Sequence, residues 1–145
     1  MKPAETSGRR RAREAALQML YQWEVGKTSP GDAILSYWPS QENGAELPAA
    51  HREFANNLVR GTIGRIADID RLLGAHAQNW RIERMAVLDR LVLRLAIFEL
   101  LAEPDTPAKV VINEALELAR AYTGEEAVPF VNGVLDGVRK ELGRQ

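Results

Sequence analysis

The chain has 145 residues, of which 46% are hydrophobic and 27% charged, so it is large enough for a globular domain and too apolar for a disordered one. It contains no cysteine and only two histidines, which excludes disulfides, thiolate metal sites and thiol catalysis; we expect neither a metal site nor a cofactor. The net charge of −1 hides an asymmetry, because residues 1–13 carry five cations and one acid, a sum of +4, and the remainder sums to −5.

Apolar residues recur with helical spacing almost throughout, and no segment alternates with the two-residue period of a half-buried strand. This pattern predicts an all-α fold of about seven helices, forming a single domain over residues 1–145. No apolar run is long enough to cross a membrane, and the N-terminus lacks the features of a secretion signal. We therefore expect a cytoplasmic protein with no membrane partner.

The first half of the chain predicts an N-terminal helical subdomain over about residues 8–78. Its first helix is expected to run from Gly8 to Val25 with an apolar stripe along one side, and residues 1–7 to be disordered in the free protein. Ser29-Pro30 is a capping residue followed by proline, which starts a second helix. Pro48 opens a third helix, and a further short helix follows it.

The second half predicts a C-terminal helical subdomain over about residues 79–145. Met85 to Leu101 is apolar nearly all round, which is typical of a central helix packed on several sides. Thr106-Pro107 has the cap-plus-proline form of a helix start. Thr123 to Glu126 has the spacing of a capping box, which predicts the start of the last helix.

Four arginines, Arg9, Arg10, Arg11 and Arg13, gather at the start of the first predicted helix. Cations are unfavourable beside the partial positive charge of a helix N-terminus, so a cluster there suggests a bound anion such as phosphate. Lys2 could extend the cluster, and about four phosphates of a single strand would give a salt slope of about −3. The alternative is a solvated tail in which Arg13 pairs with an acid elsewhere.

Aromatic side chains at the surface would add base stacking to such a basic site. Tyr21 and Phe130 are the candidates, although each could instead pack at the edge of the core. The chain has no phosphate-binding loop, dinucleotide fingerprint, zinc-protease motif or nucleophile elbow, so we predict no catalytic residues and no enzyme activity.

Three groups of residues, in this order, resemble the characteristic segments of the NusB family. The N-terminal group is Lys2-Pro3-Ala4, Arg9-Arg10-Arg11-Ala12-Arg13-Glu14 and Leu20-Tyr21-Gln22-Trp23. The other two are Val92-Leu93-Arg94-Leu95-Ala96-Ile97-Phe98-Glu99-Leu100 with Val111-Ile112-Asn113-Glu114-Ala115, and Phe130-Val131-Asn132-Gly133-Val134-Leu135-Asp136. The resemblance covers nearly the whole chain, but Glu5 to Gly8 form an insertion between Lys2 and the arginines.

The resemblance implies two small three-helix bundles packed into one domain. It implies a transcription antitermination factor that binds the single-stranded boxA element of nascent ribosomal RNA with NusE, a ribosomal small-subunit protein, in RNA polymerase complexes. The free protein would be a monomer or weak homodimer. Matched residues place RNA binding on Lys2, the four arginines and Phe130, and the NusE contact on Tyr21 and Asp89. Asp89 stands where the family pattern has a glutamate. Glu126 stands where the family pattern has an aspartate near the RNA.

Two other functions are compatible with parts of the pattern. RNA cytosine methyltransferases carry a related N-terminal domain, so the chain could be a remnant RNA-binding domain, although it has no residues for a βαβ catalytic domain. It could also be a helical protein–protein adaptor whose arginines only steer an acidic partner. Salt-dependent selectivity for an RNA sequence would distinguish the RNA-binding function from the adaptor.

Overall fold

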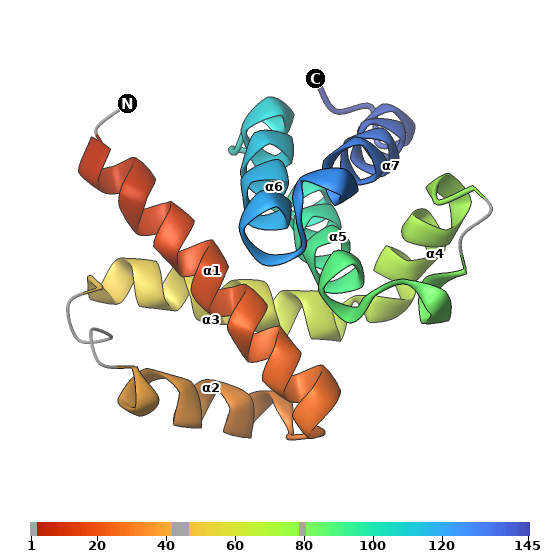
Figure 1. The fold of residues 1–145 in the computed structure, drawn as a ribbon. Coiled ribbons are helices and arrows are strands. Elements are labelled where there is room, and N and C mark those ends of the chain that lie inside the picture. Colours follow the sequence, from red (N-terminus) through yellow and green to blue (C-terminus); the bar gives the residue numbers. More distant parts are fainter. Residues whose placement is uncertain (1–2, 42–46, 79–80) are drawn as a thin grey trace. The chain divides into compact units, whose positions relative to one another are not determined.

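The computed structural model describes residues 3–41, 47–78 and 81–145. Within these ranges the chain forms α-helices and short 3-10 turns and has no strand, which confirms the all-α prediction (Figure 1). The elements, in chain order, are α1 (Pro3–Gly26), α2 (Pro30–Ser40), α3 (Ala49–Gly64), α4 (Ile66–His76), η2 (Ile82–Arg84), α5 (Val87–Ala102), α6 (Ala108–Tyr122), η3 (Glu125–Ala127) and α7 (Val128–Glu141).

The chain divides into two compact units, Met1–Ile63 and Gly64–Gln145. The first contains α1, α2 and α3, and the second contains α4, α5, α6 and α7. The division lies earlier than the expected subdomain boundary near residue 78. The reason is that α4 buries Ile69, Leu72 and Leu73 and packs against α5 and α7. The first unit therefore contains three of these α-helices, and the second contains four.

Helix α1 begins at Pro3, five residues before the expected start at Gly8. Proline is favoured in the first turn of a helix because its missing N–H would have no intrahelical acceptor there. Alanine and glutamate follow it, and both are good helix formers. The arginines consequently lie in the second and third turns, where the helix dipole no longer opposes them.

The first unit packs α1 and α2 together and lays α1 across α3 (Figure 1). Its core is an apolar cluster made of Ala12, Ala15, Ala16, Leu17, Met19, Leu20, Ala33, Ile34, Leu47, Ala55, Leu58 and Val59. Ser29 caps α2 as predicted, since its Oγ accepts a hydrogen bond from the backbone N–H of Asp32 at 3.0 Å. The Trp38 indole of α2 donates to Asn56 Oδ1 of α3 at 2.9 Å, which satisfies a polar group at the edge of the core.

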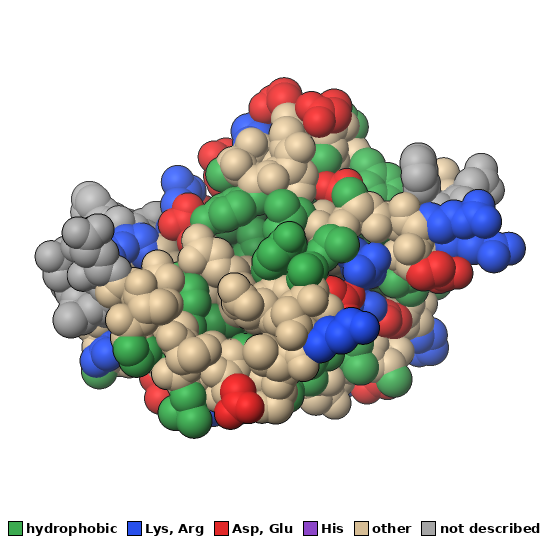
Figure 2. All heavy atoms as spheres, turned by 60° about the horizontal axis from the view of Figure 1, so that its bottom comes forward, with side chains coloured by type: hydrophobic (Ala, Val, Ile, Leu, Met, Phe, Trp, Pro, Cys, Tyr) green, Lys and Arg blue, Asp and Glu red, His purple; other side chains and the backbone are tan. Residues whose placement is uncertain are grey.

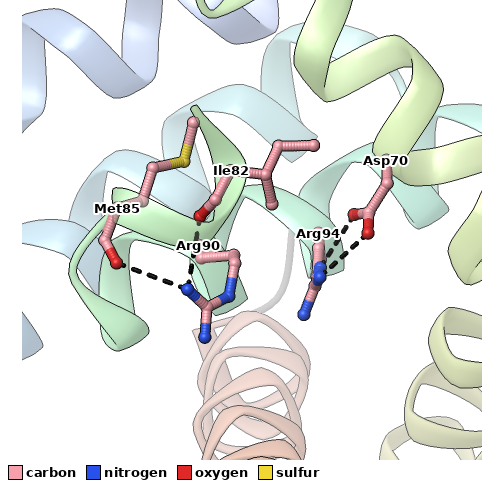
Figure 3. A network of polar contacts seen from close by, with 5 residues as sticks. All are labelled: Asp70, Ile82, Met85, Arg90 and Arg94. Carbon is pink, nitrogen blue, oxygen red and sulfur yellow. Dashed lines mark hydrogen bonds and ion pairs between the residues drawn. The ribbon is translucent and has the colours of Figure 1, made fainter. Parts of the chain in front are cut away.

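The second unit is built around α5, in which every residue from Leu91 to Leu100 is buried. Helices α4, α6 and α7 all pack against it, so the expected central helix is confirmed. Arg94 projects from α5 and donates through Nε and Nη2 to the two carboxylate oxygens of Asp70 on α4, both at 2.9 Å (Figure 3). A two-point contact between a guanidinium and a carboxylate fixes the orientation of both groups, and it joins α4 to α5.

The turn before α5 is also held by an arginine. Arg90 Nη1 donates to the carbonyl oxygens of Ile82 and Met85, each at 3.3 Å (Figure 3). Two of the charged residues that interrupt the apolar pattern of α5, Arg90 and Arg94, thus hold the segments packed beside it. No helix among the described residues is long and apolar enough to span a membrane.

The predicted capping box at Thr123 to Glu126 is wrong. Thr123 ends α6, and its hydroxyl donates to the Ala119 carbonyl at 2.8 Å instead of accepting from the next helix. Gly124 then adopts a φ of +127°, a conformation that side-chain-bearing residues rarely adopt, and α7 starts only at Val128. Thr106 is likewise buried without capping α6, whose N-cap residue is Pro107.

Candidate nucleic-acid interface

The four predicted RNA-binding arginines divide into an inner pair and an outer pair around α1. Arg9 and Arg13 are separated by one helical turn and lie on the side of α1 that carries the core residues. Arg9 is half-buried and Arg13 is 4% exposed. Arg10 and Arg11 are exposed on the outer side. Solvent, and hence an RNA phosphate, reaches the outer pair most directly.

The inner pair faces an aromatic ring on α3. The guanidinium carbon of Arg9 lies 4.3 Å from the centroid of the Phe54 ring, and that of Arg13 lies 5.4 Å from it. Both distances are within the range in which the negative face of an aromatic ring attracts a cation. One ring therefore holds two arginines of the predicted site.

Gly8 of α1 lies directly against the His51 side chain of α3. A Cβ placed on Gly8 would lie 2.2 Å from both Cε1 and Nδ1 of His51, so the imidazole rests directly on the helix backbone. Glycine is needed at this position because of space and not because of backbone conformation, since Gly8 lies inside α1. The Nδ1 atom of His51 is buried and has no hydrogen-bond partner among the described residues.

Tyr21, expected at the partner surface, projects from the outer side of α1 with 41% of its surface exposed. Val25 follows one turn later and is 48% exposed, and Leu35 of α2 is 75% exposed. Figure 2 shows hydrophobic side chains at the surface of one face of the molecule, with acidic and basic side chains scattered around them. The Tyr21 ring is therefore accessible to a protein partner.

The remaining predicted residues belong to the second unit or lie outside the described residues. Phe130 is the third residue of α7 and is half-buried. Asp89 is the third residue of α5, and its Oδ1 atom is buried without a hydrogen-bond partner among the described residues. Glu126 is exposed in η3, and Lys2 lies outside the described residues. The structure thus places the arginines with Tyr21 in one unit, and Phe130 with Asp89 in the other.

Sequence reasoning missed Phe54 and His51 as members of the basic site. Phe54 follows the apolar spacing of the third helix with Ala55, Leu58 and Val59, which by itself predicts core packing, whereas its ring is half-buried beside the arginines. Gly8 carried a usable signal, because a glycine inside a helix costs about 1 kcal/mol relative to alanine and so suggests a close contact. The identity of the contacting residue, forty-three positions later, could not be read from local pattern.

The model of the NusB family matches residues 10–140, which is most of the chain. The chain belongs to the NusB family. It is 47% identical over 139 residues to the transcription antitermination protein NusB of Solibacter usitatus, covering 94% of this chain and 91% of that protein. It is 44% identical over 136 residues to the transcription antitermination protein NusB of Myxococcus xanthus, covering 94% and 97%.

Two solved NusB structures resemble this fold closely. NusB of T. maritima superposes with a TM-score of 0.81 at 36% identity, covering 92% of this chain and 91% of that one. A chain from the complex of the antitermination factors NusB and NusE with double-stranded RNA superposes with a TM-score of 0.82 at 28% identity, covering 93% and 98%. The expected family resemblance is therefore confirmed over nearly the full length.

Proposed function

We propose that the chain is a transcription antitermination factor that binds the single-stranded boxA element of nascent ribosomal RNA together with NusE. It acts in the cytoplasm on RNA polymerase complexes, and it is a binding protein and not an enzyme. The observation that carries the proposal is the arginine cluster on α1, in which Arg10 and Arg11 are exposed. The names of the family relatives, and the NusB–NusE complex with RNA, support it.

Phosphate contacts to the arginines set the register of the RNA without reading its sequence, because every nucleotide carries the same phosphate. Arg11 suits this role, since it is exposed and makes no side-chain hydrogen bond or ion pair with any described residue. Selectivity for bases needs stacking and polar contacts, for which Phe130 is the aromatic candidate. Lys2 adds a further cation to the phosphate contacts.

Tyr21 and Asp89 contribute to the NusE surface. Tyr21 offers an exposed ring on α1, and Asp89 offers a carboxylate whose buried Oδ1 has no donor among the described residues. A donor from the partner would satisfy that oxygen and so favour the complex. RNA and NusE each bind weakly alone, and joining them in one assembly makes the second contact effectively intramolecular. The free protein is a monomer or weak homodimer.

The decisive test is fluorescence anisotropy of labelled boxA RNA, titrated with the protein alone and with NusE, beside a scrambled RNA and a double-stranded RNA. We expect selective binding of single-stranded boxA that NusE strengthens, with a slope of log affinity against log salt of about −3. The double variant Arg10→Gln/Arg11→Gln should reduce the slope to about −1.5, because it removes two phosphate contacts.

A matched control is the double variant Arg60→Gln/Arg71→Gln, which removes two exposed arginines elsewhere. It should leave the slope near that of the unsubstituted protein. Equal binding of scrambled RNA would leave only a general polyanion binder. Binding of NusE without any binding of RNA would favour the protein–protein adaptor.

A further inference from the structure

We propose that Phe54 of α3 is a positioning residue for RNA binding, whose ring also contacts Arg13 and orders Arg9 before the RNA arrives. This inference rests on the proposed function and adds a component outside the arginine segment. The observation behind it is that two arginines one turn apart on α1 both lie over the same ring, at 4.3 and 5.4 Å from its centroid.

The ring restrains Arg9 without neutralising it. A long arginine side chain samples many rotamers in solution, and a planar guanidinium stacked on an aromatic face loses most of that freedom. Among the side chains that the structure describes, no carboxylate forms a hydrogen bond or ion pair with Arg9. Its charge therefore stays available to a phosphate, while the cost of ordering the side chain is met when the protein folds.

A second contact fixes the distance between α1 and this ring. His51 lies three residues before Phe54, on the same side of α3. Its imidazole touches the α1 backbone at Gly8, the residue before Arg9. A side chain at position 8 would collide with this imidazole, so either the ring or the helix that carries Arg9 would have to shift. The glycine and the histidine thus hold the arginines at stacking distance.

The consequence for binding follows from the kind of interaction. Loss of the ring removes no charge from the protein, so the number of phosphates neutralised, and hence the salt slope, should stay the same. Affinity should fall because Arg9 must then be ordered during binding. An exposed or half-exposed cation–π contact corresponds to roughly a two- to five-fold change in affinity.

The test compares Phe54→Leu, Phe54→Trp and Tyr37→Leu by anisotropy with boxA RNA over a range of salt concentrations. Phe54→Leu keeps an apolar side chain but removes the ring, whereas Phe54→Trp keeps an aromatic face. Tyr37→Leu is the control for losing an aromatic ring in the same unit, because Tyr37 is half-buried, packs edge-on against Trp38 and donates its hydroxyl proton to Gln18 at 2.7 Å. Thermal unfolding of each variant checks that it folds.

A spectroscopic signature tests the positioning independently of RNA. The Phe54 ring current should shift the Arg9 side-chain proton resonances upfield in the free protein, and Phe54→Leu should remove that shift. In the binding assay, Phe54→Leu should bind roughly two- to five-fold more weakly at every salt concentration with an unchanged slope. Phe54→Trp should restore the affinity, and Tyr37→Leu should leave it unchanged.

Three results would overturn the inference while leaving the proposed function intact. They are unchanged affinity in Phe54→Leu, an equal loss in Tyr37→Leu, and ordinary Arg9 chemical shifts in the unsubstituted protein. Failure of the unsubstituted protein to bind boxA RNA would instead overturn the proposed function, and the positioning role for RNA with it.

Discussion

Arg9 in the first unit and Arg94 in the second are both anchored against a neighbouring helix, but by opposite kinds of partner. Arg94 donates to both carboxylate oxygens of Asp70 at 2.9 Å, whereas Arg9 lies 4.3 Å above the ring of Phe54. A carboxylate cancels the charge of the arginine it holds, and a ring leaves that charge in place. The first arrangement suits a structural contact, and the second suits a site for a polyanion.

The largest effect should come from breaking the structural contact. Asp70→Ala removes the acceptor for Arg94 and weakens the junction of α4 with α5. We expect the free energy of unfolding to fall by about 3 kcal/mol. This value is at the lower end of the range for breaking a buried ion pair, because 29% of the Asp70 side-chain surface is exposed. Urea unfolding followed by circular dichroism measures it.

The control is Asp68→Ala, on the same helix. Asp68 pairs with Arg65 at 3.5 Å, but both side chains are exposed, so its removal should cost less than about 1 kcal/mol. Equal losses of stability in the two variants would mean that the Asp70–Arg94 pair is no more important than an exposed ion pair. Arg94 could then not be contrasted with Arg9 as a structural arginine.

An intermediate effect should come from the contact beneath the arginines. Gly8→Ala places a Cβ within 2.2 Å of two ring atoms of His51, and we expect it to destabilise the protein by about 1–3 kcal/mol, as overpacking does. In a His51→Ala background the same change should be neutral or stabilising by up to about 1 kcal/mol, because alanine favours the helix. A double-mutant cycle of thermal unfolding measures the coupling.

Gly133→Ala provides the comparison for this cycle. Gly133 also lies inside a helix, α7, but a Cβ there would meet open space. It should therefore stabilise the protein by about 1 kcal/mol. A Gly8→Ala variant that is also stabilised would show that His51 can move away, so that it does not set the spacing of α1 and α3.

The smallest effect concerns a carboxylate at the surface of the second unit. Glu141 Oε1 lies 2.7 Å from Nε2 of His76, and this hydrogen bond, with the nearby charges of His76 and Arg71, holds the pKa of Glu141 below its ordinary value. A depressed carboxyl pKa contributes stability above the unfolded-state pKa, and that stability is lost as the pH falls through the folded-state pKa.

The variant Glu141→Gln should accordingly be slightly less stable than the unsubstituted protein near neutral pH. The difference should vanish on acidification to below the depressed pKa. Denaturant unfolding of both proteins across this range measures it. A difference that persists in strong acid would mean that Glu141 stabilises the unit by packing and not by its charge.

Much of the fold could be predicted because its signals are local. The apolar stripes of α1 and α3, the capping residue Ser29 and the nearly uniform apolar character of α5 are properties of short segments. Helical periodicity and capping arise from neighbours within about four residues, so they are visible in the sequence. Composition and spacing alone likewise predict that four arginines gather on α1.

Other features could not be predicted because they depend on which segments meet. The Thr123 segment has the letters of a capping box, but its hydroxyl finds the carbonyl of Ala119 in the preceding helix. Helix α4 follows α3 directly in sequence, yet its buried residues pack against α5 and α7. In both cases a local pattern admits two partners, and packing decides between them.

The sequence by itself determined that this protein is all-helical, that it belongs with the NusB family and that its basic residues gather near the N-terminus. Only the tertiary structure decided which arginines face solvent and which rest on Phe54, and it alone brought His51 against Gly8. The physical reason is that the number and spacing of charges are properties of the amino-acid sequence itself. The contacts that each charged side chain makes depend on close packing between helices that are far apart in sequence.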